Sequence, residues 1–207
     1  IKAYGSLEGM FSGWTNLQTI YLESFDTTNV TSMKEMFYGC TSLTNIVGIN
    51  SLNTQNVTTF DGIFERCSAI QSLDLSNWNT YAAENMYDMF YNCSSLESIN
   101  LKGSNWTTVH VTSMGYMFGR CTSLKQVDLS SFDTRSVKNM TYMFQYCSAL
   151  TRIIVSNSWS TSALTSSSGM FSSCTSLVGG QGTPYDSVYT SSTYARIDQR
   201  LESCNSS

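Results

Sequence analysis

Apolar positions along the chain repeat with a period of 26 to 28 residues. The clearest marker is a Met-Phe pair, replaced once by Ile-Phe, whose six successive spacings are 26, 27, 26, 28, 26 and 27 residues. The pairs begin at Met10, Met36, Ile63, Met89, Met117, Met143 and Met170. Self-similarity at such a period is typical of solenoids, in which no repeat buries its apolar stripe alone. The sequence therefore predicts one array of stacked coils.

Each repeat contains a short segment in which apolar and polar residues alternate. Leu96, for example, is followed by Ile99 and Leu101, with one polar residue between the last two. Alternation at period two predicts a short strand with one buried face. The second repeat departs from this pattern at Gly48, where we expect a bulged or shifted strand.

Every predicted strand is followed by a polar turn and then by apolar residues at a spacing of three. Thr134 is one such turn residue, and Val137, Met140 and Met143 follow it. Asp, Asn, Ser and Thr favour turns and helix N-caps, and the spacing predicts one or two turns of α or 3₁₀ helix. The predicted fold class is therefore α/β: a right-handed solenoid with one short parallel strand and one short helical segment per coil.

The repeats also predict the organisation of the chain. Residues 1–9 are expected to form the N-terminal edge of the array, residues 10–178 six full units and the start of a seventh, and residues 179–207 a C-terminal cap and tail. No stretch supplies the roughly 20 apolar residues of a membrane span. The chain opens with Ile1 and Lys2 and without a signal peptide, which indicates a fragment or a processed chain.

Composition narrows the possible partners. The chain has 35 Ser and 24 Thr but only 13% charged residues, with a net charge of −4. Nucleic-acid binding requires clustered Lys and Arg, and no such cluster occurs. The surface is therefore predicted to be polar, weakly charged and not suited to nucleic acid.

Six of the seven cysteines occupy one column of the repeat, three residues after each Phe. They are Cys40, Cys67, Cys93, Cys121, Cys147 and Cys174. Stacked residues about 4.8 Å apart lie within disulfide range, but side chains of one column point the same way, and Cys behaves as a small buried hydrophobe. We therefore interpret the column as a reduced structural ladder, with occasional bridges or metal as the alternative. Cys204 stands outside the column as a free, intermolecular or silent thiol.

An enzyme is not predicted. His110 is the only histidine and lies in the longest, 28-residue repeat, so a Ser/His/Asp or Cys/His arrangement would have to use it. No phosphate-binding loop or zinc-protease motif occurs. Neither a cofactor nor a metal is predicted.

Two faces of the array are candidates for binding. On the strand side, polar residues occupy the outward position and its flanks, where they form either a tolerated polar ladder or a patch that accepts hydrogen bonds from a glycan or peptide. These residues are Tyr21, Asp74, Asn100, Asp128, Gln126 and Arg152.

The second candidate face lies on the predicted helical side. Its tyrosines occupy positions that hold Glu, Gly, Arg or Ser in other repeats, so we expect them to be exposed, either as protein or sugar contacts or as surface filler. They are Tyr38, Tyr87, Tyr91, Tyr116, Tyr142 and Tyr146.

The frame Met-Phe-x-x-Cys-x-x-Leu-x-x-Ile-x-Leu resembles the leucine-rich repeat of the Bacteroides surface protein A (BspA)-like family, in its Met-Phe variety, also known as a mycoplasma-type domain of unknown function. The resemblance covers roughly residues 7 to 178, and residues 177–183 and 193–198 resemble the segment that closes such arrays. Two features depart from it: Trp14 replaces Cys in the first unit, and residues 199–207 do not follow the expected ending.

This resemblance implies a bacterial surface-exposed or secreted adhesin that binds host or microbial protein or glycan outside the cell. The alternative is a structural spacer or a self-assembling surface subunit. The resemblance identifies neither the ligand nor the oligomeric state.

Overall fold

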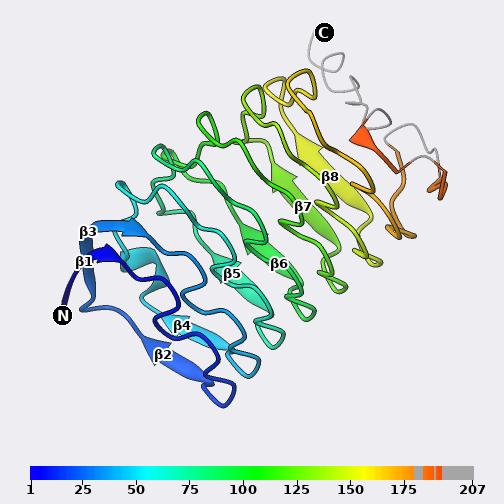
Figure 1. Cartoon of the computed structure of the whole chain (residues 1–207). Helices are drawn as coiled ribbons and strands as arrows, with labels where there is room; N and C mark the ends of the chain where they lie inside the picture. The colour runs from blue at the N-terminus through cyan, green and yellow to red at the C-terminus, as the bar shows by residue number, and fades with distance from the viewer. Residues whose placement is uncertain (180–183, 189, 193–207) are drawn as a thin grey trace, which may run out of the picture.

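The computed structural model describes residues 1–179, 184–188 and 190–192. Over these residues the chain forms a parallel β-solenoid of about six turns (Figure 1). The predicted repeat solenoid is thereby confirmed.

One row of short strands runs along the stack. Its members are β2 (Thr19–Tyr21), β4 (Asn45–Val47), β5 (Ser72–Asp74), β6 (Ser98–Asn100), β7 (Gln126–Leu129) and β8 (Arg152–Val155). Figure 1 shows the six side by side, with β2 nearest the N-terminal end. The pairs β2–β4, β5–β6 and β7–β8 are parallel and without register shifts, so equivalent residues of successive coils lie next to each other. These are the strands that the alternating pattern predicted.

A second line of pairing joins the coils at another side. β1 (Lys2–Ser6) pairs in parallel with β3 (Asp26–Ser32), with register shifts between Lys2 and Tyr4 and between Gly5 and Ser6. Single-residue parallel bridges then continue the line from coil to coil. They link Ser32, Thr59, Asn85, Ser113, Asn139 and Ser166 in that order.

The predicted helical segments, and with them the α/β class, are wrong. Within residues 1–179 the only helix is the three-residue 3₁₀ helix η1 (Ile49–Ser51). Around the Met-Phe pair, the N–H groups of Met36 and Tyr38 donate to the carbonyl oxygens three residues earlier, whereas those of Glu35 and Phe37 donate to the next coil. The result is a chain of tight turns.

Left-handed residues are the physical reason for these turns. Glu35 and Gly39 have φ angles of 52° and 68°, and both equivalent positions have positive φ in the other coils as well. An α-helix cannot continue through such residues. Successive three-residue turns also give apolar residues at a spacing of three, so the sequence pattern did not separate them from a helix.

The bulged or shifted strand expected in the second repeat is wrong, because its strand has no register shift. β4 keeps its register with β2 through Val47, and the chain then turns at Gly48, where φ is 81°. A Cβ atom at Gly48 would lie 2.7 Å from the backbone nitrogen of Glu23. Only glycine fits this position, and η1 begins directly after it.

The core is built from columns of identical side chains. The seven phenylalanines of the Met-Phe pairs stack through the solenoid with ring centroids 5.4 to 5.8 Å apart and interplanar angles of 2° to 20°. The Met and Cys columns beside them are inaccessible to solvent in all but the first coil. The coil stack therefore buries one continuous core.

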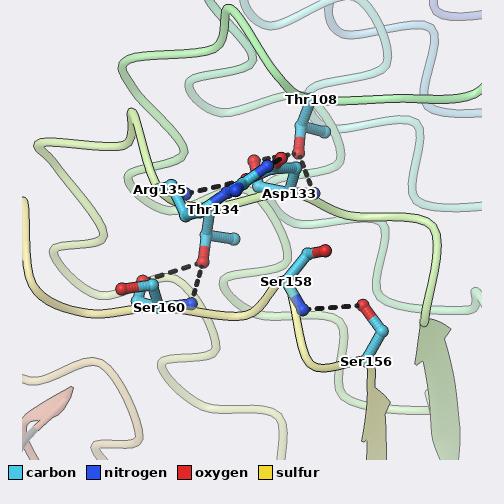
Figure 2. A network of polar contacts seen from close by, with 7 residues as sticks. All are labelled: Thr108, Asp133, Thr134, Arg135, Ser156, Ser158 and Ser160. Atoms are coloured by element: carbon cyan, nitrogen blue, oxygen red, sulfur yellow. Dashed lines mark hydrogen bonds and ion pairs between the residues drawn. The ribbon is translucent and has the colours of Figure 1, made fainter.

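One interior column is polar. Its threonines are at most 1% exposed, and each Oγ1 donates to a carbonyl oxygen of the next coil over 2.6 to 2.9 Å. These residues are Thr27, Thr54, Thr80, Thr108 and Thr134. Figure 2 shows two of them, Thr108 with Asp133 and Thr134 with Ser160. The threonines therefore link neighbouring coils.

Residues near the C-terminus lie against the last coil. The N–H of Phe171 donates to the carbonyl oxygen of Thr190 over 2.9 Å, and that of Ser173 donates to the Tyr185 hydroxyl over 2.9 Å. Much of the predicted cap, including residues 180–183 and 193–198, lies outside the described residues, as does Cys204. The division at residues 9 and 178 stays a prediction.

Candidate functional site

On the strand row, Asp74, Asn100 and Asp128 lie in one column on neighbouring strands. Asp74 of β5 is the register partner of Asn100 of β6, and β7 follows β6 in the row (Figure 1). Each side-chain Oδ1 accepts the N–H of the residue two further on, over 3.0 to 3.1 Å. These side chains therefore close the turn that ends their own strand.

The two carboxylates of this column are stabilised in their charged form. Hydrogen bonds from Ser76 hold the pKa of Asp74 below its usual value. Burial acts to raise the pKa of Asp128, but hydrogen bonds from Lys102 and Ser130 outweigh it and the pKa is lowered. Lys102 also forms an ion pair with Asp128. The chain itself thus occupies much of the acceptor capacity predicted for a ligand.

The other predicted strand-face residues lie around this column. Tyr21 is 73% exposed and pairs with Val47, so one coil separates it from Asp74. Gln126 and Arg152 are exposed register partners on β7 and β8. The strand row is therefore a mostly polar surface with one isolated exposed ring at its N-terminal end.

The six tyrosines of the Met-Phe turns define the tyrosine face, and four of them form a ring cluster. Tyr116 lies at its centre, with ring centroids 5.8 Å from Tyr87, 5.6 Å from Tyr91 and 5.0 Å from Tyr142. Tyr146 is 43% exposed, as expected for this face, whereas the other five are only half-buried rather than exposed. Four of the half-buried rings cover one another across successive coils, whereas the Arg66 guanidinium lies over Tyr38.

Three of these rings lie against glycines of the following coil. Sequence reasoning missed these contacts. A Cβ atom at Gly115 would lie 2.7 Å from Tyr87, and one at Gly169 would lie 2.3 Å from Tyr142. Gly119 receives Tyr91 in the same way, at 3.0 Å. The signal in the sequence was a glycine one repeat after each of these tyrosines. The rings thus lie directly over backbone.

Two of the clustered tyrosines occupy left-handed backbone positions. Tyr116 and Tyr142 have φ angles of 54° and 55°, and the equivalent residues in three other coils are glycines. The left-handed conformation costs a residue with a Cβ atom roughly 1–2 kcal/mol. Glycine would be the less strained choice, so the backbone does not explain tyrosine there.

A cluster of acidic residues lies on the same Met-Phe turns, from the first coil to the coil of Tyr87 and Tyr91, and sequence reasoning missed it. Lys34 pairs with Glu35 and with Asp61, each at 3.6 Å, and Arg66 pairs with Glu65 at 3.4 Å. The signal was that these acids share repeat positions with the tyrosines. The acidic turns, defined as Glu8, Glu35, Asp61, Glu65 and Asp88, thus carry five carboxylates beside two cations.

Burial and mutual repulsion disfavour charge on three of these carboxylates, those of Asp61, Glu65 and Asp88. Burial raises the pKa of Asp88 to about 7, and the negative charges of Glu65 and Asp61 act in the same direction. Burial likewise raises the pKa of Asp61 and that of Glu65. Even with Asp88 about half protonated at neutral pH, the carboxylates of the acidic turns outnumber Lys34 and Arg66, so this surface holds negative charge that its own cations do not fully compensate.

Replacing Asp88 with Asn should stabilise the protein in a pH-dependent way. The native carboxyl keeps its proton up to about pH 7 and the unfolded one only to about pH 4, so wild-type stability falls as pH rises through this window. Asn carries no charge and tolerates the φ of 52° at this position. We expect Asp88→Asn to gain about 1–2 kcal/mol at pH 8, reduced by solvent screening, and almost nothing at pH 4.

Thermal unfolding between pH 4 and pH 8 measures this effect. The matched control is Glu97→Gln, which removes the same charge from an exposed position beside β6 and should leave the unfolding midpoint nearly unchanged. A gain for Asp88→Asn that is the same at every pH would contradict the electrostatic explanation.

The six column cysteines are buried and free. Each thiol donates to the carbonyl oxygen of the Phe one coil earlier, over 2.9 to 3.2 Å. Burial raises the pKa of every one, to about 12 for Cys93 and Cys174. Such thiols are poor nucleophiles and metal ligands, because the thiolate is the reactive form.

Features that would indicate catalysis or a metal are few. His110 is exposed and contacts Tyr81 edge-on, with ring centroids 4.9 Å apart. In the described part of the chain no group of three or more His, Cys, Asp or Glu is arranged to hold a metal ion. Nor does any helix among those residues have the length and apolarity that a membrane crossing requires.

The repeated coils, the Met-Phe-Cys columns and the tight turns define a leucine-rich-repeat-like β-solenoid protein. The model of the family described as "Mycoplasma protein of unknown function, DUF285" matches residues 5–103 and 96–182, and the chain belongs to this family. The resemblance stated from the Met-Phe frame is thereby confirmed.

A crystal structure of a leucine-rich repeat protein from Bacteroides ovatus ATCC 8483, at 1.19 Å resolution, is similar with 20% identity and a TM-score of 0.36. The similarity covers 78% of this chain and 48% of that one, so the chain spans about half the length of that protein. No curated protein matches the chain.

Proposed function

We propose that the chain is a non-catalytic binding module displayed outside the cell, acting as an adhesin toward an extracellular protein or glycan through its tyrosine face. The observation that carries the proposal is the cluster around Tyr116, in which four rings from three successive coils meet on one surface. Tyrosine is enriched where binding energy concentrates, because it combines a large apolar ring with a polar tip.

The cost of the cluster to the fold supports a role in binding. Tyr116 and Tyr142 occupy left-handed positions where Gly9, Gly62 and Gly169 serve the same turn without strain. Residues held in disfavoured backbone conformations are often found at functional sites. The rings are also pre-organised by their contacts with one another, which reduces the entropy lost on binding.

A binding screen against immobilised matrix proteins, mucins and glycans tests the proposal. We expect saturable binding to one class, weakened at least tenfold by Tyr116→Ala. The matched control is Tyr21→Ala, which removes a 73% exposed tyrosine from the strand row and should leave affinity within twofold. Equal loss in both variants, or loss only with Tyr21→Ala, would place the site elsewhere. No binding to any class would favour a structural spacer or an assembly subunit.

A further inference from the structure

The tyrosine face and the acidic turns form one continuous surface, because they occupy the same repeat positions in successive coils. Glu35 and Asp88 hold the position that Tyr116 and Tyr142 hold further along the chain. Asp61 holds the position of Tyr87, which lies two residues before the first residue of the Met-Phe pair. A partner that lies along the solenoid axis would therefore contact both the carboxylates and the tyrosine rings.

The aromatic part of this surface already binds cations of its own chain. The Arg66 guanidinium lies 5.6 Å from the ring centroid of Tyr38, and the Arg120 guanidinium lies 4.9 Å from that of Tyr146. A cation over an aromatic face gains roughly 0.5–2 kcal/mol, with the larger values where water is excluded. These two contacts show that rings of this face accept guanidinium groups in a suitable geometry.

The charged part of the surface favours the same kind of ligand. Lys34 pairs with Glu35 and Asp61, and Arg66 pairs with Glu65. Within the described residues, no ion pair reaches the Asp88 carboxylate. Approach of a positive side chain relieves repulsion between half-buried carboxylates, whereas a negative partner would add to it.

We infer that the partner recognised by the tyrosine face is a protein segment bearing arginine or lysine side chains, which lie over the tyrosine rings and pair with the carboxylates of the acidic turns. This inference rests on the proposed function, because it names the partner class of the same face. Charge complementarity favours a basic protein over a neutral glycan. It also predicts binding that weakens as salt concentration rises.

A fluorescein-labelled peptide of six alternating Arg-Gly units tests the inference directly against the full chain. Peptides with Ser or Glu in place of Arg are the ligand controls, and fluorescence anisotropy gives Kd at 50 and 300 mM salt. We expect the Arg peptide alone to bind, with Kd raised at least fivefold by Asp61→Asn combined with Glu65→Gln, and also by Tyr116→Ala.

The protein control removes two charges from the strand side. Glu23→Gln combined with Glu97→Gln changes the net charge by the same amount at exposed positions near β2 and β6, and should alter Kd by less than twofold. Equal weakening by both double variants would reduce the effect to net charge and overturn the inference, as would absence of Arg-peptide binding or binding of the Glu peptide.

Competition separates this inference from the proposed function. If the chain binds a matrix protein or glycan through Tyr116 but excess Arg peptide does not displace it, the tyrosine-face function stands and the basic partner is wrong. If Tyr116→Ala leaves the binding of matrix protein unchanged, the proposed function fails. Displacement by the Arg peptide and not by the Ser peptide supports both.

Discussion

Phe118→Ala should destabilise the protein by about 3–5 kcal/mol, the range observed when a buried phenylalanine is truncated in a core. Phe118 is inaccessible to solvent and stacks on Phe90 at 5.4 Å and on Phe144 at 5.5 Å. Its removal opens a cavity in the middle of the column and also interrupts the contact between two coils. In a repeat protein each coil is stabilised mainly by its neighbours, so a central cavity weakens both halves.

Urea unfolding followed by tryptophan fluorescence measures this loss. Phe11→Ala is the matched control, because Phe11 is the half-buried first ring of the same column and stacks on only one other column ring, that of Phe37. We expect it to cost about 1–2 kcal/mol, less than Phe118→Ala. Equal losses in the two variants would contradict a column whose stability depends on neighbours on both sides.

The period and the buried columns could be predicted from the sequence because stacking puts equivalent residues into the same environment. Met-Phe pairs, Cys residues and alternating apolar residues recur in register, and their burial follows from that recurrence. The turns could not be predicted as turns, since a spacing of three fits a helix equally well. Gly9, Gly39 and Gly62 were the available signal, because glycine recurs where the backbone is left-handed.

The candidate site was predicted only in part, for a related reason. Comparison of repeats found the tyrosine positions, but variety at a position does not reveal whether its side chain is exposed. Tyr116 is half-buried because rings of the neighbouring coils pack against it, and Tyr87 lies over Gly115 because that residue lacks a side chain. Such contacts depend on how the side chains are oriented between coils, which the repeat alone does not fix.

For the strand-face column, the sequence pattern found the outward residues but not what they do. Its outward residues were recognised from the strand period. Asp74 and Asp128, however, accept hydrogen bonds from the backbone N–H groups two residues further on. Asp, Asn, Ser and Thr do the same at other corners of the coil, for example Asn79 toward Tyr81 and Asn139 toward Thr141. Polar corner residues are thus frequent because turns need them, and polarity alone did not distinguish a binding surface from a turn.

The interior threonine column leads to the second large effect, for Thr108→Val. The Thr108 hydroxyl donates to the carbonyl oxygen of Asp133 over 2.7 Å and accepts the N–H of Asp133 over 2.9 Å (Figure 2). Valine has nearly the same shape, so the change leaves no cavity. It does remove the hydroxyl that pairs with both the N–H and the carbonyl oxygen of Asp133. Each unsatisfied buried group costs about 1–3 kcal/mol, and because Asp133 is only half-buried we expect the lower part of that range for its two groups, about 2–4 kcal/mol in total.

Chemical unfolding of Thr108→Val and Thr112→Val separates hydrogen bonding from the general effect of adding valine. Thr112 is exposed, and its hydroxyl makes only a 3.3 Å contact with the Glu84 carbonyl oxygen, so its replacement should cost less than about 0.5 kcal/mol. Thr108→Ser keeps the hydroxyl and should lose only about 1 kcal/mol, for its missing methyl group. If Thr108→Val were as stable as wild type, the threonine column would fill space without joining the coils, and the stacked apolar columns alone would account for their cohesion.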